Sequence, residues 1–264
     1  MIKKQITILL PIHQMSEDDA KMLQNALISI EDFYNDIKLT IICPSDVKKK
    51  LLDFDFGQKL EVKILENQTN DTGFIAQVNL GIDDCDTEWF SIMEIDDTYK
   101  PIWLKSMNEY IQEYKEIDVF LPVVKDINDQ GTFLSFTNES AWAYGFTEKQ
   151  GIIDNEVLLE YQNYQTSGGL FRTTKIKDIG KLKENIKLTF TYEFLLRITH
   201  NGLGMMVVPK IGYEHVNFRE NSLFWAYKND ESKKMTENEV KFWLETAKKE
   251  FFFKNKREII YVEN

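Results

Sequence analysis

The sequence of 264 residues predicts an α/β fold with a mostly parallel sheet and helices on both faces. Three observations lead to this prediction. Apolar runs of strand length recur through the first half of the chain, amphipathic helical patterns lie between them, and polar residues follow the runs. This alternation is typical of β-α-β units, whose parallel strands end at one edge of the sheet, where ligands usually bind. A ligand site is therefore expected at that edge.

The first expected strand is Ile6 to Ile12, an almost continuous apolar run of the kind found in strands buried on both faces. Ser16 and Asp19 have the spacing of a capping box, and apolar residues then recur at helical intervals as far as Phe33, so a helix should follow. The next expected elements are a strand at 39–43, a short helix through 52, a strand at 60–65 and a helix at 74–82. This part of the chain thus predicts three successive β-α units.

The fourth expected strand, Trp89 to Ile95, brings three carboxylates to the edge of the sheet: Glu94, Asp96 and Asp97. Because unpaired buried carboxylates are costly, they need cations, donors or water. Mg²⁺ and Mn²⁺ prefer oxygen ligands, so a divalent cation is one explanation. The other is that these residues only end the strand and help to cap the helix that Pro101 begins.

The second half of the chain has a less regular pattern. The expected elements are a helix at 103–114, a strand at 119–124, a turn at 126–131, a strand at 132–136, a strand after 168–169, a helix at 191–201, a strand at 205–208 and a helix at 237–254. The segment 138–165 is rich in aromatic residues, which suits either a sugar-stacking surface or a core.

Composition limits the functional classes. The formal net charge of −11 argues against non-specific nucleic-acid binding, which depends on neutralisation of phosphates by Lys and Arg. No apolar run is long enough for a transmembrane segment and no signal peptide is recognisable, so a cytoplasmic protein is expected. Cys43 and Cys85 lack metal or disulfide spacing and are expected to be reduced thiols. The basic residues at 248–257 alternate with phenylalanines, which suits an anionic surface contact or a solvated helix face.

Several short motifs follow one another in a recognisable order. They are Pro11-Ile12-His13-Gln14 after the first strand, Gly73 to Gly81 with Ala76 and Asn79, Glu94-Ile95-Asp96-Asp97 followed by Pro101, Gly168-Gly169, the segment 179–184, and FTYEFLLR ending at Arg197. With this order and spacing, the chain resembles the GT-A fold glycosyltransferases, specifically family 2, over about its first 225 residues. The resemblance implies a GT-A domain at 1–225 and a helical C-terminal appendage at 226–264.

The resemblance implies a metal-dependent glycosyltransferase. It would move a single sugar from a nucleotide-sugar donor, expected to be a UDP-sugar, to an acceptor hydroxyl on a glycan, lipid or protein. The Gln-x-x-Arg-Trp signature of processive synthases is missing from the sequence, so non-processive transfer is expected. The metal, Mn²⁺ or Mg²⁺, would stabilise the charge that grows on the departing nucleoside diphosphate.

The resemblance also implies roles for individual residues. Asp96 would bind the metal that bridges the diphosphate, Glu94 would lie near the ribose or the metal, and Asp97 would act through water or by orienting the loop. His215 would be a late metal or phosphate ligand, with a structural histidine as the alternative. The other residues expected to bind the donor are Pro11, His13, Asp46 and Asn79.

One departure from the family pattern concerns the catalytic base. Thr191 stands where inverting members carry the catalytic Asp, and Phe190 stands at the preceding Glu position. Neither accepts a proton near neutral pH, whereas displacement at a sugar carbon needs a base within hydrogen-bond reach of the acceptor. Glu193 lies roughly 200° around the helix from Thr191 and would need a shift of register. Asp154 or Glu156 could serve instead.

The same departure favours an alternative function. Besides Thr191, Glu94 and Gln14 replace the Asp and Asn of the family motifs. These changes suit a GT-A-like nucleotide- or carbohydrate-binding protein whose catalysis is lost or weakened. A third possibility is nucleotide chemistry unrelated to sugars, in which the protein would respond to nucleoside triphosphates but not to UDP or GDP conjugates.

Overall fold

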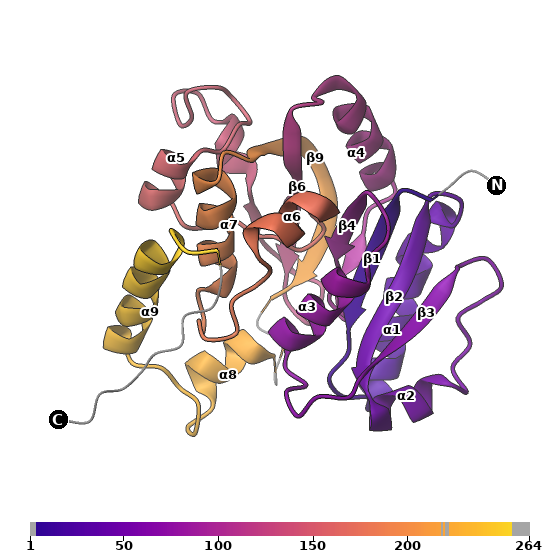
Figure 1. Cartoon of the computed structure of the whole chain (residues 1–264). Helices are drawn as coiled ribbons and strands as arrows, with labels where there is room; N and C mark the ends of the chain where they lie inside the picture. The colour runs from indigo at the N-terminus through magenta and orange to yellow at the C-terminus, as the bar shows by residue number, and fades with distance from the viewer. Residues whose placement is uncertain (1–3, 218, 220–221, 255–264) are drawn as a thin grey trace.

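The structure is a computed structural model, and it describes residues 4–217, 219 and 222–254 (Figure 1). Its centre is a twisted sheet with helices packed around it. Within these residues the sheet has nine strands, in the order β3-β2-β1-β4-β8-β6-β9-β5, with β7 paired to the C-terminal part of β6. The predicted α/β class with a mostly parallel sheet and helices on both faces is confirmed.

The N-terminal half forms the parallel part of the sheet. β1 (Ile6–Pro11) lies between β2 (Ile37–Pro44) and β4 (Trp89–Ile92), and β3 (Val62–Asn67) forms the edge beyond β2. The connecting elements are α1 (Glu17–Ile30), the 3₁₀ turn η1 (Glu31–Phe33), α2 (Ser45–Leu51) and α3 (Phe74–Asp84). The sequence predicts this half almost element by element.

The rest of the sheet mixes strand directions. β8 (Leu170–Arg172) runs antiparallel to both β4 and β6 (Ile117–Ile127), and β9 (Gly204–Val216) runs parallel to β6. Two short strands complete it, because β5 (Thr98–Tyr99) pairs with β9 and β7 (Phe133–Thr137) pairs with β6. Among the named strands of the described residues, antiparallel pairing is thus confined to the contacts of β5, β7 and β8, and one isolated antiparallel bridge joins Ile152 to Met206 of β9.

The remaining helices are α4 (Ile102–Glu113), η2 (Glu139–Trp142), α5 (Asn155–Glu160), α6 (Thr173–Ile179), α7 (Phe190–His200), α8 (Leu223–Asn229) and α9 (Glu237–Glu250). The sequence pattern does not predict α5, α6 and α8, since helices of six or seven residues are too short for a clear apolar period. α9 ends four positions before the predicted end. None of the helices described combines the length and apolar character needed to cross a bilayer.

Three predicted strand ends that matter for the site are wrong. β9, expected to end at Val208, continues to Val216 and therefore carries His215 within the sheet. β4 ends at Ile92, so Glu94 and Asp97 belong to a turn beyond the strand. β6 continues to Ile127, through the segment expected to be a turn, and therefore carries Asp126 within the sheet. Polar turn-forming residues indicate where a chain can bend, but pairing with β7 and β9 decides where this strand stops.

The core lies on both faces of the sheet. Alternate residues of β1 point to opposite sides, so that Ile8 belongs to one cluster and Leu9 to the other. The first cluster is covered by α1, α2 and α4, and the second by α3, α6 and α7. Ala247 of α9 and the neighbouring Phe251 are buried in the second cluster. The C-terminal helix thus shares the core of the sheet, and α8 spans the boundary expected after residue 225.

A buried ion-pair network fixes α7. The guanidinium of Arg197, which is 0% exposed, donates to both oxygens of Glu193 at 2.8 and 3.0 Å. It also donates to the carbonyl oxygen of Ile179, the last residue of α6, at 3.0 Å and to that of Lys181, in the loop that follows, at 2.8 Å. Lys183 Nζ lies 2.9 Å from Glu193 Oε1. Because every charge has partners, the network joins α7 to the loop after α6 without leaving an unpaired ion.

Replacement of Arg197 by Met should lower the free energy of unfolding by about 3 kcal/mol or more, because it leaves buried carbonyl groups and part of Glu193 without donors. Urea unfolding followed by tryptophan fluorescence measures the change. Lys21→Met is the control, since Lys21 forms an exposed ion pair with Asp18 and its loss should leave the midpoint nearly unchanged. Equal midpoints for the two variants would contradict the structural role of Arg197.

Candidate functional site

A cavity of about 340 Å³ opens where β1, β4, β6 and β9 end. Residues that the sequence places far apart meet here because the parallel strands finish at the same edge of the sheet. Of the residues singled out from the sequence, those that line the cavity are Pro11, His13, Glu94, Asp96, Thr191 and His215. The expected convergence of strand ends on one hollow is therefore present in the structure.

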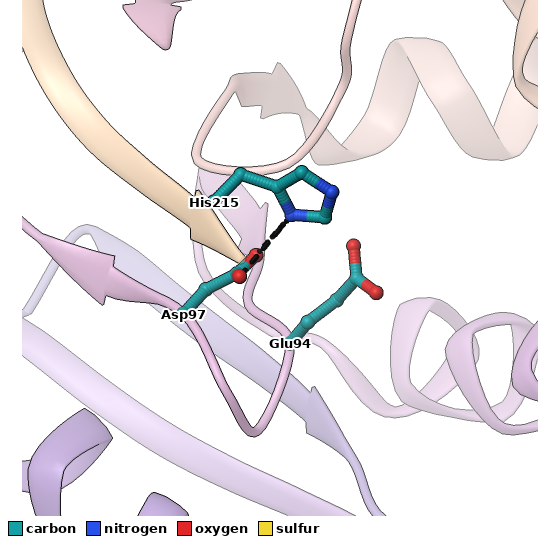
Figure 2. A group of neighbouring side chains, drawn as sticks. All are labelled: Glu94, Asp97 and His215. Atoms are coloured by element: carbon teal, nitrogen blue, oxygen red, sulfur yellow. Dashed lines mark hydrogen bonds and ion pairs between the residues drawn. The ribbon is translucent and has the colours of Figure 1, made fainter. Parts of the chain in front are cut away.

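Asp97 lies beneath this cavity and holds the end of β9. Its carboxylate is fully buried and accepts a hydrogen bond of 2.9 Å from the Val216 amide. His215 Nδ1 lies 3.1 and 3.0 Å from its two oxygens (Figure 2). β5 pairs with β9 directly after Asp97, so the turn that follows β4 is tied to β9 by both backbone and side chain. Asp97 thus fixes the orientation of the His215 ring.

Glu94 faces the same ring from the other side of the turn (Figure 2). Ser167 Oγ donates to Glu94 Oε1 at 3.0 Å, and the Glu94 amide donates to the Tyr213 hydroxyl at 3.2 Å. Burial, with the nearby charge of Asp97, raises the pKa of the Glu94 carboxyl to about 7. Burial alone would lower the pKa of His215, but the negative charge of Asp97, with that of Glu94, outweighs burial and raises the pKa to about 10.

The side chains present fit a divalent cation. Glu94, Asp97 and His215 each offer one possible ligand atom, and these three atoms lie within 4.8 Å of one another. Burial, and after it the negative charge of Asp97, raises the pKa of Glu94, and a divalent cation would offset both effects. A histidine held by a carboxylate through one ring nitrogen is a common arrangement for metal binding through the other nitrogen. Glu94 and His215 would hold the ion, and Asp97 would hold the ring.

Asp96 lines the cavity but has a different partner. Arg219 Nε donates to Asp96 Oδ2 at 2.5 Å, and Arg219 Nη1 lies 4.0 Å from Asp19 Oδ1. Asp19 also accepts from the Ser16 amide at 2.8 Å in the predicted capping box of α1. Burial raises the pKa of Asp96, and the Arg219 charge opposes this rise. The possible ligand atoms that lie close together thus belong to Glu94, Asp97 and His215, while Asp96, the expected metal ligand, is paired with Arg219.

Three of the residues expected in the donor or catalytic site lie elsewhere. Asp46 is exposed in the first turn of α2 and does not line the cavity. The Asn79 amide donates to the Leu182 carbonyl at 2.8 Å and its oxygen accepts from the Leu182 amide at 3.0 Å, so it anchors a loop. Glu193 is buried in the ion pair with Arg197. Their polar groups are occupied by structural contacts or by solvent.

The other candidate bases are also outside the cavity. Asp154 caps α5 by accepting from the Val157 amide at 2.8 Å, and Glu156 is exposed on the same helix. Thr191 does line the cavity, at the first turn of α7, but its hydroxyl is not a base at neutral pH. At position 191 the cavity wall thus carries a hydroxyl group, where the family pattern has a carboxylate.

Several lining residues have no motif in the sequence. Arg219 lies beyond β9 in a segment without periodicity, and Asp126 stands in a stretch that resembles a turn. Gly168 does not line the cavity itself, but it follows the lining residue Ser167 and has a usable sequence signal, because its φ of 73° favours glycine. A Cβ at Gly168 would lie 2.5 Å from the ring of Tyr213, so the glycine also lets Tyr213 approach Glu94. The Gly-Gly motif therefore marks a position where the fold requires glycine.

Comparison with known proteins agrees with this geometry. The family model described as glycosyl transferase family 2 matches residues 21–179. Among solved structures, S. aureus TarS 1-349 is similar, with a TM-score of 0.60 and 17% identity over 81% of this chain and 61% of that chain. The same TarS fragment with UDP-GlcNAc gives a TM-score of 0.63 and 18% identity over 92% and 66%. The fragment with UDP gives 0.60 and 18% over 80% and 60%.

The structural similarity covers only part of the TarS fragment. The chain spans 61% of the TarS 1-349 chain. At identities of 17% and 18%, the likeness shows the GT-A fold. No curated protein gave a significant sequence match to the chain.

Replacement of Asp97 by Asn should bring the pKa of His215 down from about 10 toward its ordinary value of 6.5. Because this pKa is raised in the folded chain, the contact stabilises the fold fully below pH 6.5 and loses that contribution as the pH rises toward 10. NMR titration of the metal-free protein measures the ring directly, since the chain has only three histidines. Asp86→Asn, which changes an exposed carboxylate, should leave the titration unchanged.

Proposed function

Because the chain belongs to glycosyl transferase family 2, we propose that it transfers a single sugar from a nucleotide-sugar donor to an acceptor hydroxyl in the cavity described above. The fold supports the proposal, since TarS structures with UDP and with UDP-GlcNAc share it. A UDP-sugar is therefore the proposed donor, and transfer is proposed to be non-processive. The acceptor class is a glycan, lipid or protein that carries a free hydroxyl.

The observation that carries the proposal is the cluster of Glu94, Asp97 and His215 at the cavity. A cavity of about 340 Å³ has the size of a small-molecule site, and this one combines it with groups suited to a cation. A nucleoside diphosphate is negatively charged and would be repelled by the acidic wall in the absence of positive charge. The proposed Mn²⁺ or Mg²⁺ thus makes the acidic cavity compatible with its ligand.

The cavity residues have separate proposed roles. Glu94 and His215 would hold the metal ion, and Asp97 would keep the His215 ring in place. When bound, the ion would act as a Lewis acid that stabilises charge on the departing diphosphate. Pro11 and His13, at the end of β1, would contact the base and ribose. Burial lowers the pKa of His13, so this ring would be neutral at neutral pH.

A nucleotide- or carbohydrate-binding protein without catalysis is the second candidate. Thr191 favours it, because the cavity wall at that position offers a hydroxyl in place of a carboxylate. The burial of Glu193 in an ion pair adds to this argument, since that residue is not available as a substitute. The two candidates differ in whether a bound donor reacts.

Incubation with a panel of UDP- and GDP-sugars in the presence of Mn²⁺ tests the proposal. We expect slow release of free sugar from one donor, with UDP-GlcNAc tested first, because water can replace a missing acceptor. Calorimetry with UDP and Mn²⁺ measures binding separately. Binding without hydrolysis of any donor would support the second candidate. Binding of nucleoside triphosphates but of no UDP or GDP compound would contradict both.

Variants of the proposed ligands test the metal. His215→Gln and Glu94→Gln should each weaken Mn²⁺ binding by about tenfold to a hundredfold and reduce the Mn²⁺-dependent rise in melting temperature that UDP gives. Differential scanning fluorimetry with UDP, with and without Mn²⁺, measures the effect. Glu109→Gln, an exposed change on α4, should keep the full rise. A full rise in the two cavity variants would show that the metal binds elsewhere or is not needed.

A further inference from the structure

Asp126 lines the cavity, and none of the roles proposed above uses it. It lies near the end of β6, where the sheet register places it beside His215 of β9 and Ser135 of β7. The residue is only 3% exposed. A buried carboxylate at the wall of a cavity is costly unless it has hydrogen bonds, a cation or a ligand. The contacts of Asp126 therefore indicate which of its carboxylate oxygens can meet a ligand.

Two hydroxyl groups bind the same oxygen of Asp126. Thr137 Oγ1 donates to Oδ2 at 2.6 Å, and Ser135 Oγ donates to Oδ2 at 3.0 Å. Within the described part of the chain, no group donates to Oδ1, and no Lys, Arg or His forms an ion pair with the carboxylate. The hydroxyl groups thus fix the plane of the carboxylate and leave Oδ1 as the atom able to meet a ligand.

The other carboxylates that line the cavity have partners. Asp96 is paired with Arg219, and Glu94 belongs to the cluster that fits a cation. Thr191 lines the cavity at the position where the family carries its base, but a hydroxyl does not accept a proton at neutral pH. Among the described lining residues, Asp126 is the carboxylate that has neither an ion pair with Lys, Arg or His nor a place in the cation cluster.

We propose that Asp126 is the general base that accepts the proton of the acceptor hydroxyl. This inference rests on the proposed glycosyl transfer. The acceptor oxygen forms a bond to the anomeric carbon of the donor, while the bond between that carbon and the diphosphate oxygen breaks. The electron pair of the broken bond stays on the diphosphate, and the acceptor proton moves to Oδ1 of Asp126. The proposed base thus lies near the end of β6, and not on helix α7, where the family pattern places it.

Ser135 and Thr137 have a positioning role in this scheme. Their hydroxyl groups hold Oδ2, which prevents the carboxylate from turning its occupied oxygen toward the acceptor. Both residues belong to β7, a strand that pairs only with β6 in the described residues. The β6–β7 hairpin would therefore form the acceptor side of the cavity, and the β1 and β4 ends would form the donor side.

Kinetics of donor hydrolysis with Asp126→Asn tests the proposal, with the UDP-sugar of the panel that the unchanged protein hydrolyses fastest. The amide keeps the shape and can accept the same hydrogen bonds, but it cannot take a proton. We expect kcat to fall by about a hundredfold or more, with little change in KM for the donor. Asp129→Asn, an exposed change in the same hairpin, should keep normal kinetics.

The outcomes separate this proposal from the proposed function. Hydrolysis by the unchanged protein with normal kcat in Asp126→Asn would overturn the role of Asp126 alone, as would a higher KM at constant kcat. Binding of UDP-GlcNAc and the other donors without hydrolysis by the unchanged protein would overturn transfer and base together. If Asp126→Asn does not fold, Thr137→Val removes the 2.6 Å donor at similar volume. A fall in its kcat would support the proposal, and an unchanged kcat would overturn it.

Discussion

The cavity depends on the buried contact between Asp97 and the end of β9. β4 and β9 are separated by β8 and β6 in the sheet, so no ladder of backbone hydrogen bonds joins their ends directly. The short strand β5 crosses this gap by pairing with β9, and Asp97 then binds His215 and the Val216 amide. Without this contact, the acidic turn and the histidine would belong to separate parts of the sheet.

Around this contact, within the described residues, the carboxylates outnumber the cations, and Glu94 is the carboxylate left without a cation. Three carboxylates, Glu94, Asp96 and Asp97, lie in one turn, and two cations, His215 and Arg219, lie beside them. His215 pairs with Asp97 and Arg219 pairs with Asp96, so Glu94 is left with a serine hydroxyl. Burial, together with the charge of Asp97, raises the pKa of Glu94 to about 7. A cation bound beside Glu94 would offset this negative charge.

The sequence predicts the parallel half of the fold because each element there has its own local signal. The apolar run of β1, the capping box of α1 and the acidic end of β4 all lie within short windows. The site contacts lack such signals. Arg219 and Asp96 are 123 positions apart, and only the folded sheet brings them together. Short motifs likewise say nothing about whether a side chain such as Asn79 is free or already bound to Leu182.

Gly168 limits which substitutions this fold tolerates. Its carbonyl accepts from Trp103 Nε1 at 2.7 Å, its amide donates to the Ile92 carbonyl at 2.9 Å, and the Tyr213 ring occupies the place of a side chain. An inherited change here would dislodge Tyr213 and Glu94 together. By contrast, Phe133 and Phe136 of β7 are exposed and do not line the cavity, so changes there should disturb neither the sheet nor the site. The fold thus combines a position that tolerates little change, at Gly168, with a surface on β7 that should tolerate substitution.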